Sequence, residues 1–152
     1  MTWYELWLFL HISAAIVWIG GAVTVQVIAL LTKRANDPAQ AAAFGRNSAF
    51  VGTRVFAPSS VLVLATGLAL TENGSWDWSE PFIYLGLIGW ALVAGTAFLF
   101  LSRAIGRASR RIATEGPSPA LMAEIGRLIV LARVLVFVLF VIVFLMTVKP
   151  GT

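Results

Sequence analysis

The feature that most constrains this chain is a run of 27 positions, between Glu5 and Lys33, that contains no Asp, Glu, Lys or Arg. A bilayer core of about 30 Å is crossed by about 20 apolar helical residues, so this run is long enough to span it. Only 12% of the 152 residues are charged, whereas soluble domains usually carry about 25%. The mean hydropathy is +0.89. We therefore predict an integral membrane protein.

Three further apolar runs follow, at residues 55–71, 81–102 and 128–148, the last interrupted by Arg133. They predict an all-α, four-helix transmembrane bundle that forms one integral membrane domain over residues 1–152. The expected transmembrane helices cover approximately residues 4–32, 50–71, 81–104 and 120–148.

Several local signals refine these helices. Asp37-Pro38 and Ser118-Pro119 each place an N-cap residue before a proline at the first helical position. Residues 39–50 and 108–113 are expected to extend the second and third helices beyond the membrane. Pro58 removes a backbone hydrogen bond inside the second helix, so a kink is expected there. The first helix is not a signal peptide, because its apolar run is too long and no basic segment precedes it.

The charged residues separate into two groups. Most basic residues fall within residues 33–54 and 103–133, whereas the opposite helix ends are mainly acidic. Because short loops rich in Lys and Arg stay cytoplasmic, we predict a multi-pass protein of the bacterial cytoplasmic (inner) membrane with both termini outside. The sequence pI near 10.4 then reflects topology and attraction to anionic lipid. The lipid bilayer is the expected partner, and no nucleic-acid partner is expected.

The chain's only histidine, His11, lies within the first apolar run. Residues three, four and seven apart share a helix face, so His11 aligns with Ala14 and Trp18, and Gly21 lies near the edge of that face. Small residues allow close approach to the backbone. An imidazole beside such a surface suits an axially ligated porphyrin, so His11 is the candidate haem-iron ligand and Ala14, Trp18 and Gly21 are candidate cofactor contacts.

Two other roles for His11 stay open. A neutral histidine can hydrogen-bond a backbone carbonyl or a serine across the bundle, such as Ser59 or Ser60, with Ala14 and Gly21 serving only helix packing. An ionisable residue inside a membrane can also carry protons. No second axial ligand stands at the depth of His11, so a bound haem is expected to be five-coordinate or shared between the His11 side chains of a homodimer.

Arg133 is the other costly residue in an apolar segment. Its side chain either snorkels to the headgroups or contacts an anionic ligand or the carbonyl freed by Pro58. The second reading adds Arg133 to the candidate cofactor site. Cysteine is absent, which excludes disulfides and thiolate metal sites, and phosphate-binding loops and nucleophile motifs are also missing.

Three short motifs resemble those of HemJ-type protoporphyrinogen oxidases. They are His11-x6-Trp18-x2-Gly21 in the first helix, Pro58-x8-Gly67 in the second and Lys149-Pro150 after the fourth. The same outline occurs in CopD-like copper-resistance proteins and in a related four-helix family of unknown function, to which this chain is most similar. The resemblance implies a four-helix membrane protein that binds b-type haem through the first-helix histidine.

Two departures bear on enzymatic activity. The HemJ-type family has a functional Lys at the start of its third helix, where this chain has Phe82. Its fourth helix carries an Asn-Glu pair, where this chain has Ala132 and Arg133. The polar groups associated with protoporphyrinogen-oxidase activity are therefore missing from this chain. The resemblance leaves open whether the chain has that activity.

These observations predict a small membrane protein that binds haem b, or a related tetrapyrrole, through His11 and supports electron transfer with a membrane redox partner. The alternative is a cofactor-free accessory or scaffold subunit that packs in a homo-oligomer or a larger membrane complex. A transporter is disfavoured because the helices carry few polar groups, among them Gln26 and Thr66.

Overall fold

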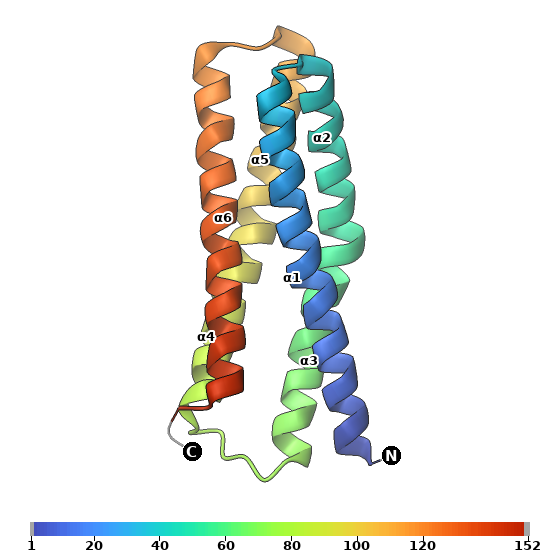
Figure 1. The fold of residues 1–152 in the computed structure, drawn as a ribbon, viewed down its shortest axis with the longest axis vertical. Helices are drawn as coiled ribbons and strands as arrows, with labels where there is room; N and C mark the ends of the chain where they lie inside the picture. Colours follow the sequence, from blue (N-terminus) through green and yellow to red (C-terminus); the bar gives the residue numbers. More distant parts are fainter. Residues whose placement is uncertain (1, 151–152) are drawn as a thin grey trace.

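The computed structural model describes residues 2–150, which form long helices and the short links between them (Figure 1). Four helical stretches are long and apolar enough to cross a membrane: Trp3–Ala35, Pro38–Asn73, Pro81–Glu115 and Pro119–Val148. The predicted all-α architecture with four transmembrane helices is therefore confirmed. Both described ends of the chain lie at the same end of the bundle.

The first stretch is one unbroken helix, α1 (Trp3–Ala35). A capping box begins it: the Thr2 hydroxyl accepts from the backbone N–H of Glu5, and the Glu5 carboxylate accepts from the backbone N–H of Thr2. It ends at Asn36, which adopts a left-handed conformation with φ 51°. At 1.5 Å per residue the helix is about 50 Å long, so it extends beyond the apolar layer.

The second helical stretch begins well before the apolar run at residues 55–71, in agreement with the extension expected over residues 39–50. Helix α2 (Pro38–Val51) is capped by the Asp37 side chain, which accepts from the Ala39 N–H. A π-helical turn, η1 (Gly52–Phe56), then leads into α3 (Ala57–Asn73). A π-helical turn inserts one residue into the hydrogen-bond ladder, and here it ends two residues before Pro58, where a kink was expected.

The third stretch has the same composite form. Helix α4 (Pro81–Gly95) passes through a second π-helical turn, η2 (Thr96–Leu101), into α5 (Ser102–Glu115). The extension past residue 104 was expected, whereas η2 was not, since residues 96–101 contain no proline. The last helix, α6 (Pro119–Val148), starts at the expected cap, where the Ser118 hydroxyl accepts from the Leu121 N–H.

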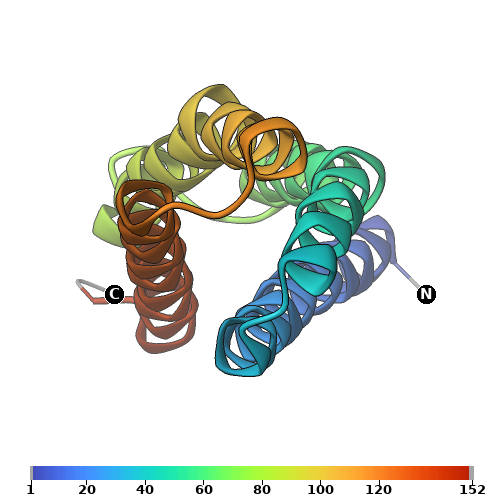
Figure 2. The same ribbon diagram turned by 90° about the horizontal axis from the view of Figure 1, so that it is seen from above.

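Packing divides the bundle lengthwise into two ends. At the end that carries both termini, here called the terminal end, α1 packs mainly on α3 and α4 mainly on α6. At the other end, here called the basic end, α2 packs against α5, and the helices form an open arc with α1 and α6 at its two ends (Figure 2). A buried apolar cluster joins the two halves, and includes Trp18, Val93, Leu101, Leu128 and Leu135.

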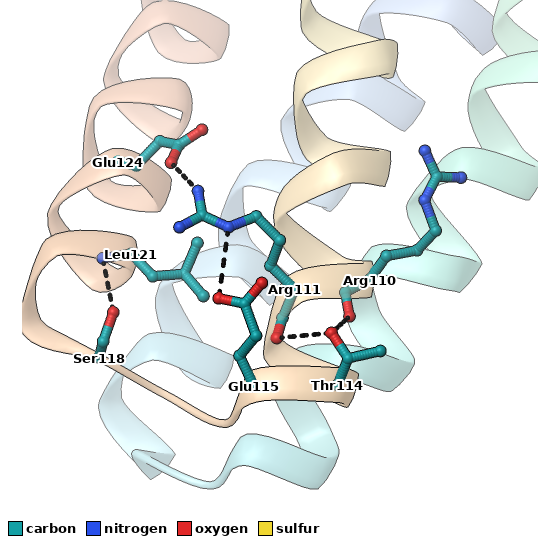
Figure 3. A network of polar contacts seen from close by, with 7 residues as sticks. All are labelled: Arg110, Arg111, Thr114, Glu115, Ser118, Leu121 and Glu124. Carbon is teal, nitrogen blue, oxygen red and sulfur yellow. Dashed lines mark hydrogen bonds and ion pairs between the residues drawn. The ribbon is translucent and has the colours of Figure 1, made fainter.

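A polar network ties α5 to α6 at the basic end (Figure 3). The Arg111 guanidinium lies 3.7 Å from the Glu115 carboxylate and donates to Glu124 at 3.2 Å. All three side chains are largely exposed, so each pair contributes less than about 1 kcal/mol. They join the two helix ends that flank the short link 116–118.

Candidate functional site

His11 lies on the face of α1 that packs against α3. Its Nδ1 is 3.0 Å from the hydroxyl oxygen of Thr66, a side chain that is 0% exposed. The next residue, Gly67, faces the ring so closely that a Cβ atom there would stand 3.2 Å from His11 Cε1. A glycine at position 67 therefore allows α3 to pack directly on the imidazole.

The hydrogen bonds around Thr66 favour one tautomer of His11. The Thr66 hydroxyl donates to the Leu62 carbonyl at 2.6 Å. A hydroxyl has one hydrogen, so toward His11 the oxygen acts as an acceptor and Nδ1 is the donor. In the neutral ring the lone pair then lies on Nε2. This assignment follows from the bonding pattern, and it leaves Nε2 as the atom able to ligate a metal or accept a proton.

The structure brings Ala14, Trp18 and Gly21 onto the same side of α1 as His11, as the spacing predicted. Ala14 and Trp18 are only 5% and 4% exposed, and Trp18 belongs to the central apolar cluster. A Cβ atom at Gly21 would stand 2.6 Å from a ring carbon of Phe56. Protein side chains therefore fill this face, and the described residues leave no open porphyrin-sized surface on it.

Arg133 does not join this group. It is an exposed residue of α6, a helix that runs antiparallel to α1 (Figure 1). His11 lies eight residues from the end of α1 that belongs to the terminal end, whereas Arg133 lies fifteen residues from the corresponding end of α6. The structure thus separates the candidate iron ligand from the candidate anion contact.

The side chain that His11 meets on α3 is Thr66 and not Ser60, one of the two serines offered as examples. The Ser60 hydroxyl donates to the Ala57 carbonyl of its own helix at 3.1 Å. The Ser60 carbonyl accepts from the indole N–H of Trp90 at 3.0 Å, a bond that joins α3 to α4. Within residues 2–150, no group of three or more His, Cys, Asp or Glu side chains could hold a metal ion.

A cavity of about 230 Å³ lies at the basic end, between α1, α2, α5 and α6. Gln26 lines it, and the side-chain oxygen of Gln26 is buried without a hydrogen-bond partner among the described residues. The sequence reasoning did not connect Gln26 with a site. One signal was present, because Gln26 is the only amide side chain in the uncharged run that forms α1.

Comparison with known families agrees with this architecture. Residues 5–150 match the family model described as "Predicted integral membrane protein (DUF2269)". The chain belongs to this family. Membership in DUF2269 confirms a membrane family of unknown function, as the resemblance implied, whereas the link to HemJ-type or CopD-like proteins stays a prediction. No curated protein and no solved structure matches the chain.

Proposed function

We propose that this DUF2269 protein binds b-type haem, or a related tetrapyrrole, through His11 Nε2 and supports electron transfer to a redox partner in the bacterial cytoplasmic membrane. The observation that carries the proposal is the hydrogen-bond chain from His11 Nδ1 through the Thr66 hydroxyl to the Leu62 carbonyl. Histidines that ligate metals commonly donate their other ring N–H to such an acceptor, which fixes the tautomer and the ring orientation.

The burial of His11 and of the residues beside it bears on which parts of this site fit a haem. His11 fits haem iron in its donor atom, and the residue is only partly buried. The face formed by Ala14, Trp18 and Gly21 is filled by protein, so these residues shape the packing around His11 rather than receive the macrocycle. A homodimer in which two copies present His11 to one ligand accounts for both facts. The tetrapyrrole would supply one-electron chemistry that the side chains of this protein lack.

The charge distribution supports a defined orientation in the membrane. The basic end carries Lys33 and Arg34 in the last turn of α1, and α5 adds arginines at positions 103, 107, 110 and 111. By the positive-inside rule this end faces the cytoplasm. Both termini and His11 then lie toward the outer side, so the proposed haem is held near the outer leaflet.

A second candidate function is a cofactor-free accessory or scaffold subunit. The filled face around Ala14 and Trp18 favours it, because His11 already has a partner in Thr66 and needs no ligand to be stable. On this reading His11 joins α1 to α3, and the function lies in protein partners within the membrane.

Absorption spectra distinguish the two functions. The protein is purified in mild detergent, supplied with haem, and recorded oxidised and dithionite-reduced, beside His11→Ala and Thr66→Val. Haem binding predicts a Soret band with reduced b-type peaks that His11→Ala abolishes and Thr66→Val shifts or weakens. Thr24→Val is the matched control, because the Thr24 hydroxyl bonds only the Gly20 carbonyl of its own helix. A wild-type protein that stays colourless, or a spectrum unchanged in His11→Ala, overturns the proposal.

A further inference from the structure

The cavity at the basic end is lined by residues of four helices, α1, α2, α5 and α6. Along α1 its lining runs from Val25 and Gln26 to Asn36. Ten residues separate Gln26 from Asn36, so the cavity follows the helix for about 15 Å. A volume of about 230 Å³ spread over that length gives a narrow space, which suits a slender molecule better than a broad ring system.

The walls along this length are mostly apolar and include Ala29, Phe44, Ile105, Leu128 and Ile129, while Thr32 and Ser109 add hydroxyl groups. The charged lining residues, Lys33 and Asp37, both lie at the α1–α2 link. The other end of the cavity therefore holds no charged side chain from the described residues, and an anionic or cationic ligand group would find no partner there.

The deep end of the cavity is polar but neutral. Gln26 is ten residues before Asn36 on α1, and Ser48 is ten residues after Pro38 on α2, so the antiparallel helices bring both to one level. The side-chain oxygen of Gln26 is buried and is the only such atom without a hydrogen-bond partner in residues 2–150. Buried polar atoms are almost always paired, so this oxygen calls for a hydrogen-bond donor from a bound molecule.

We propose that this cavity binds a neutral, membrane-borne amphiphile with a slender apolar body and a hydroxyl head, and that the head bonds the Gln26 amide. A hydroxyl can donate to the amide oxygen and accept from its NH₂ group. The apolar body then lies among the apolar wall residues.

The proposed site is separate from His11. Val25, the first lining residue on α1, is 14 residues from His11, or about 21 Å along the helix. Ligand binding here neither requires nor excludes a tetrapyrrole at the terminal end, so the two proposals are tested by different readouts.

Photolabelling tests the site directly. The probe is decanol with a diazirine at its far end, compared with the same diazirine-bearing alkane without the hydroxyl, both added to the full chain in detergent. In Gly126→Leu the new side chain enters the cavity, because Gly126 lines it and a Cβ atom there meets nothing within 4 Å. Gly106→Leu is the matched control: its Cβ atom is equally unobstructed, but Gly106 does not line the cavity.

The proposal predicts that the alcohol labels the lining segments of α1, α2, α5 and α6 about tenfold more than the alkane does, the factor expected for one hydrogen bond. Gly126→Leu abolishes this labelling and Gly106→Leu does not. Gln26→Leu lowers labelling by the alcohol to the level of the alkane, which decides the question even if Gly126→Leu fails to fold. Equal labelling by both probes in the wild type, no labelling of the cavity, or labelling that survives both substitutions overturns the proposal.

Discussion

The hydrogen bond between His11 and Thr66 makes a quantitative prediction about stability. Thr66→Val keeps the shape of the side chain but removes the oxygen that accepts from His11 Nδ1 at 3.0 Å. Leaving a buried donor unpaired costs about 1–3 kcal/mol, while hydrogen bonds between membrane helices average about 0.6 kcal/mol and reach about 1.7. We expect Thr66→Val to lower the free energy of unfolding by about 1–2 kcal/mol, which is a factor of about 5–30 in the folded-to-unfolded ratio.

The assay is a double-mutant cycle with His11→Ala, in which the free energy of unfolding of each variant is measured in detergent micelles by steric trapping or SDS titration. If the bond exists, the coupling energy is about 0.6–1.7 kcal/mol. Thr24→Val, which removes a hydroxyl bonded only within α1, changes stability by less than about 0.5 kcal/mol. Equal losses from Thr66→Val and Thr24→Val, or a coupling below about 0.3 kcal/mol, would refute the assigned contact and with it the tautomer of His11.

Two further predictions concern other parts of the chain. Gly45→Ala places a Cβ atom 2.7 Å from Ser109 Cβ, so α2 and α5 must separate and the free energy of unfolding falls by about 1–3 kcal/mol. Gly106→Ala, whose Cβ atom meets nothing within 4 Å, instead raises the free energy of unfolding by about 0.5–1 kcal/mol. The same unfolding assay checks both. In the link between α3 and α4, hydrogen bonds from the backbone and side chain of Ser79 lower the pKa of Asp77 below its ordinary value, so the stability they contribute is present above the unfolded pKa and is lost as the pH falls through the folded one. An NMR titration of the Asp77 carboxyl carbon should give a depressed pKa that Ser79→Ala raises only part of the way toward the ordinary value, because the backbone N–H of residue 79 still donates. An identical pKa in both proteins would show that the Ser79 hydroxyl does not bond Asp77.

The sequence determines the helices more completely than it determines their contacts. An uncharged run of membrane length predicts α1 directly, and the two caps at Asp37 and Ser118 predict where α2 and α6 begin. These signals are local, because a cap acts within the first turn of its own helix. The π-helical turn η2 (Thr96–Leu101) has no local signal of this kind, since its residues are ordinary apolar helix formers.

The candidate site shows the same limit. The spacing of His11, Ala14 and Trp18 predicts that they share a helix face, and the structure places them so. It does not predict which residue of α3 meets His11, because that depends on how far α3 is shifted along α1. A shift of six residues, or about 9 Å, separates the expected Ser60 from the observed Thr66. The filled face around Trp18 depends on the same packing, which no spacing within α1 can show.

His11 and Gln26 present the same physical problem with different outcomes. Inside a membrane a polar side chain finds no water, so the protein or a ligand must supply its hydrogen-bond partner. For His11 the protein supplies it, and the Thr66 hydroxyl leaves a ring nitrogen with a defined lone pair. For Gln26 the described part of the chain supplies none, although Ser48 lies at the same level of the cavity. A group that is already paired can serve packing alone, whereas an unpaired oxygen at the end of an apolar cavity is costly to the folded protein unless something binds there. The Gln26 cavity is for this reason the stronger indication of a ligand, and Gln26→Leu should stabilise the ligand-free protein while weakening its binding of the alcohol.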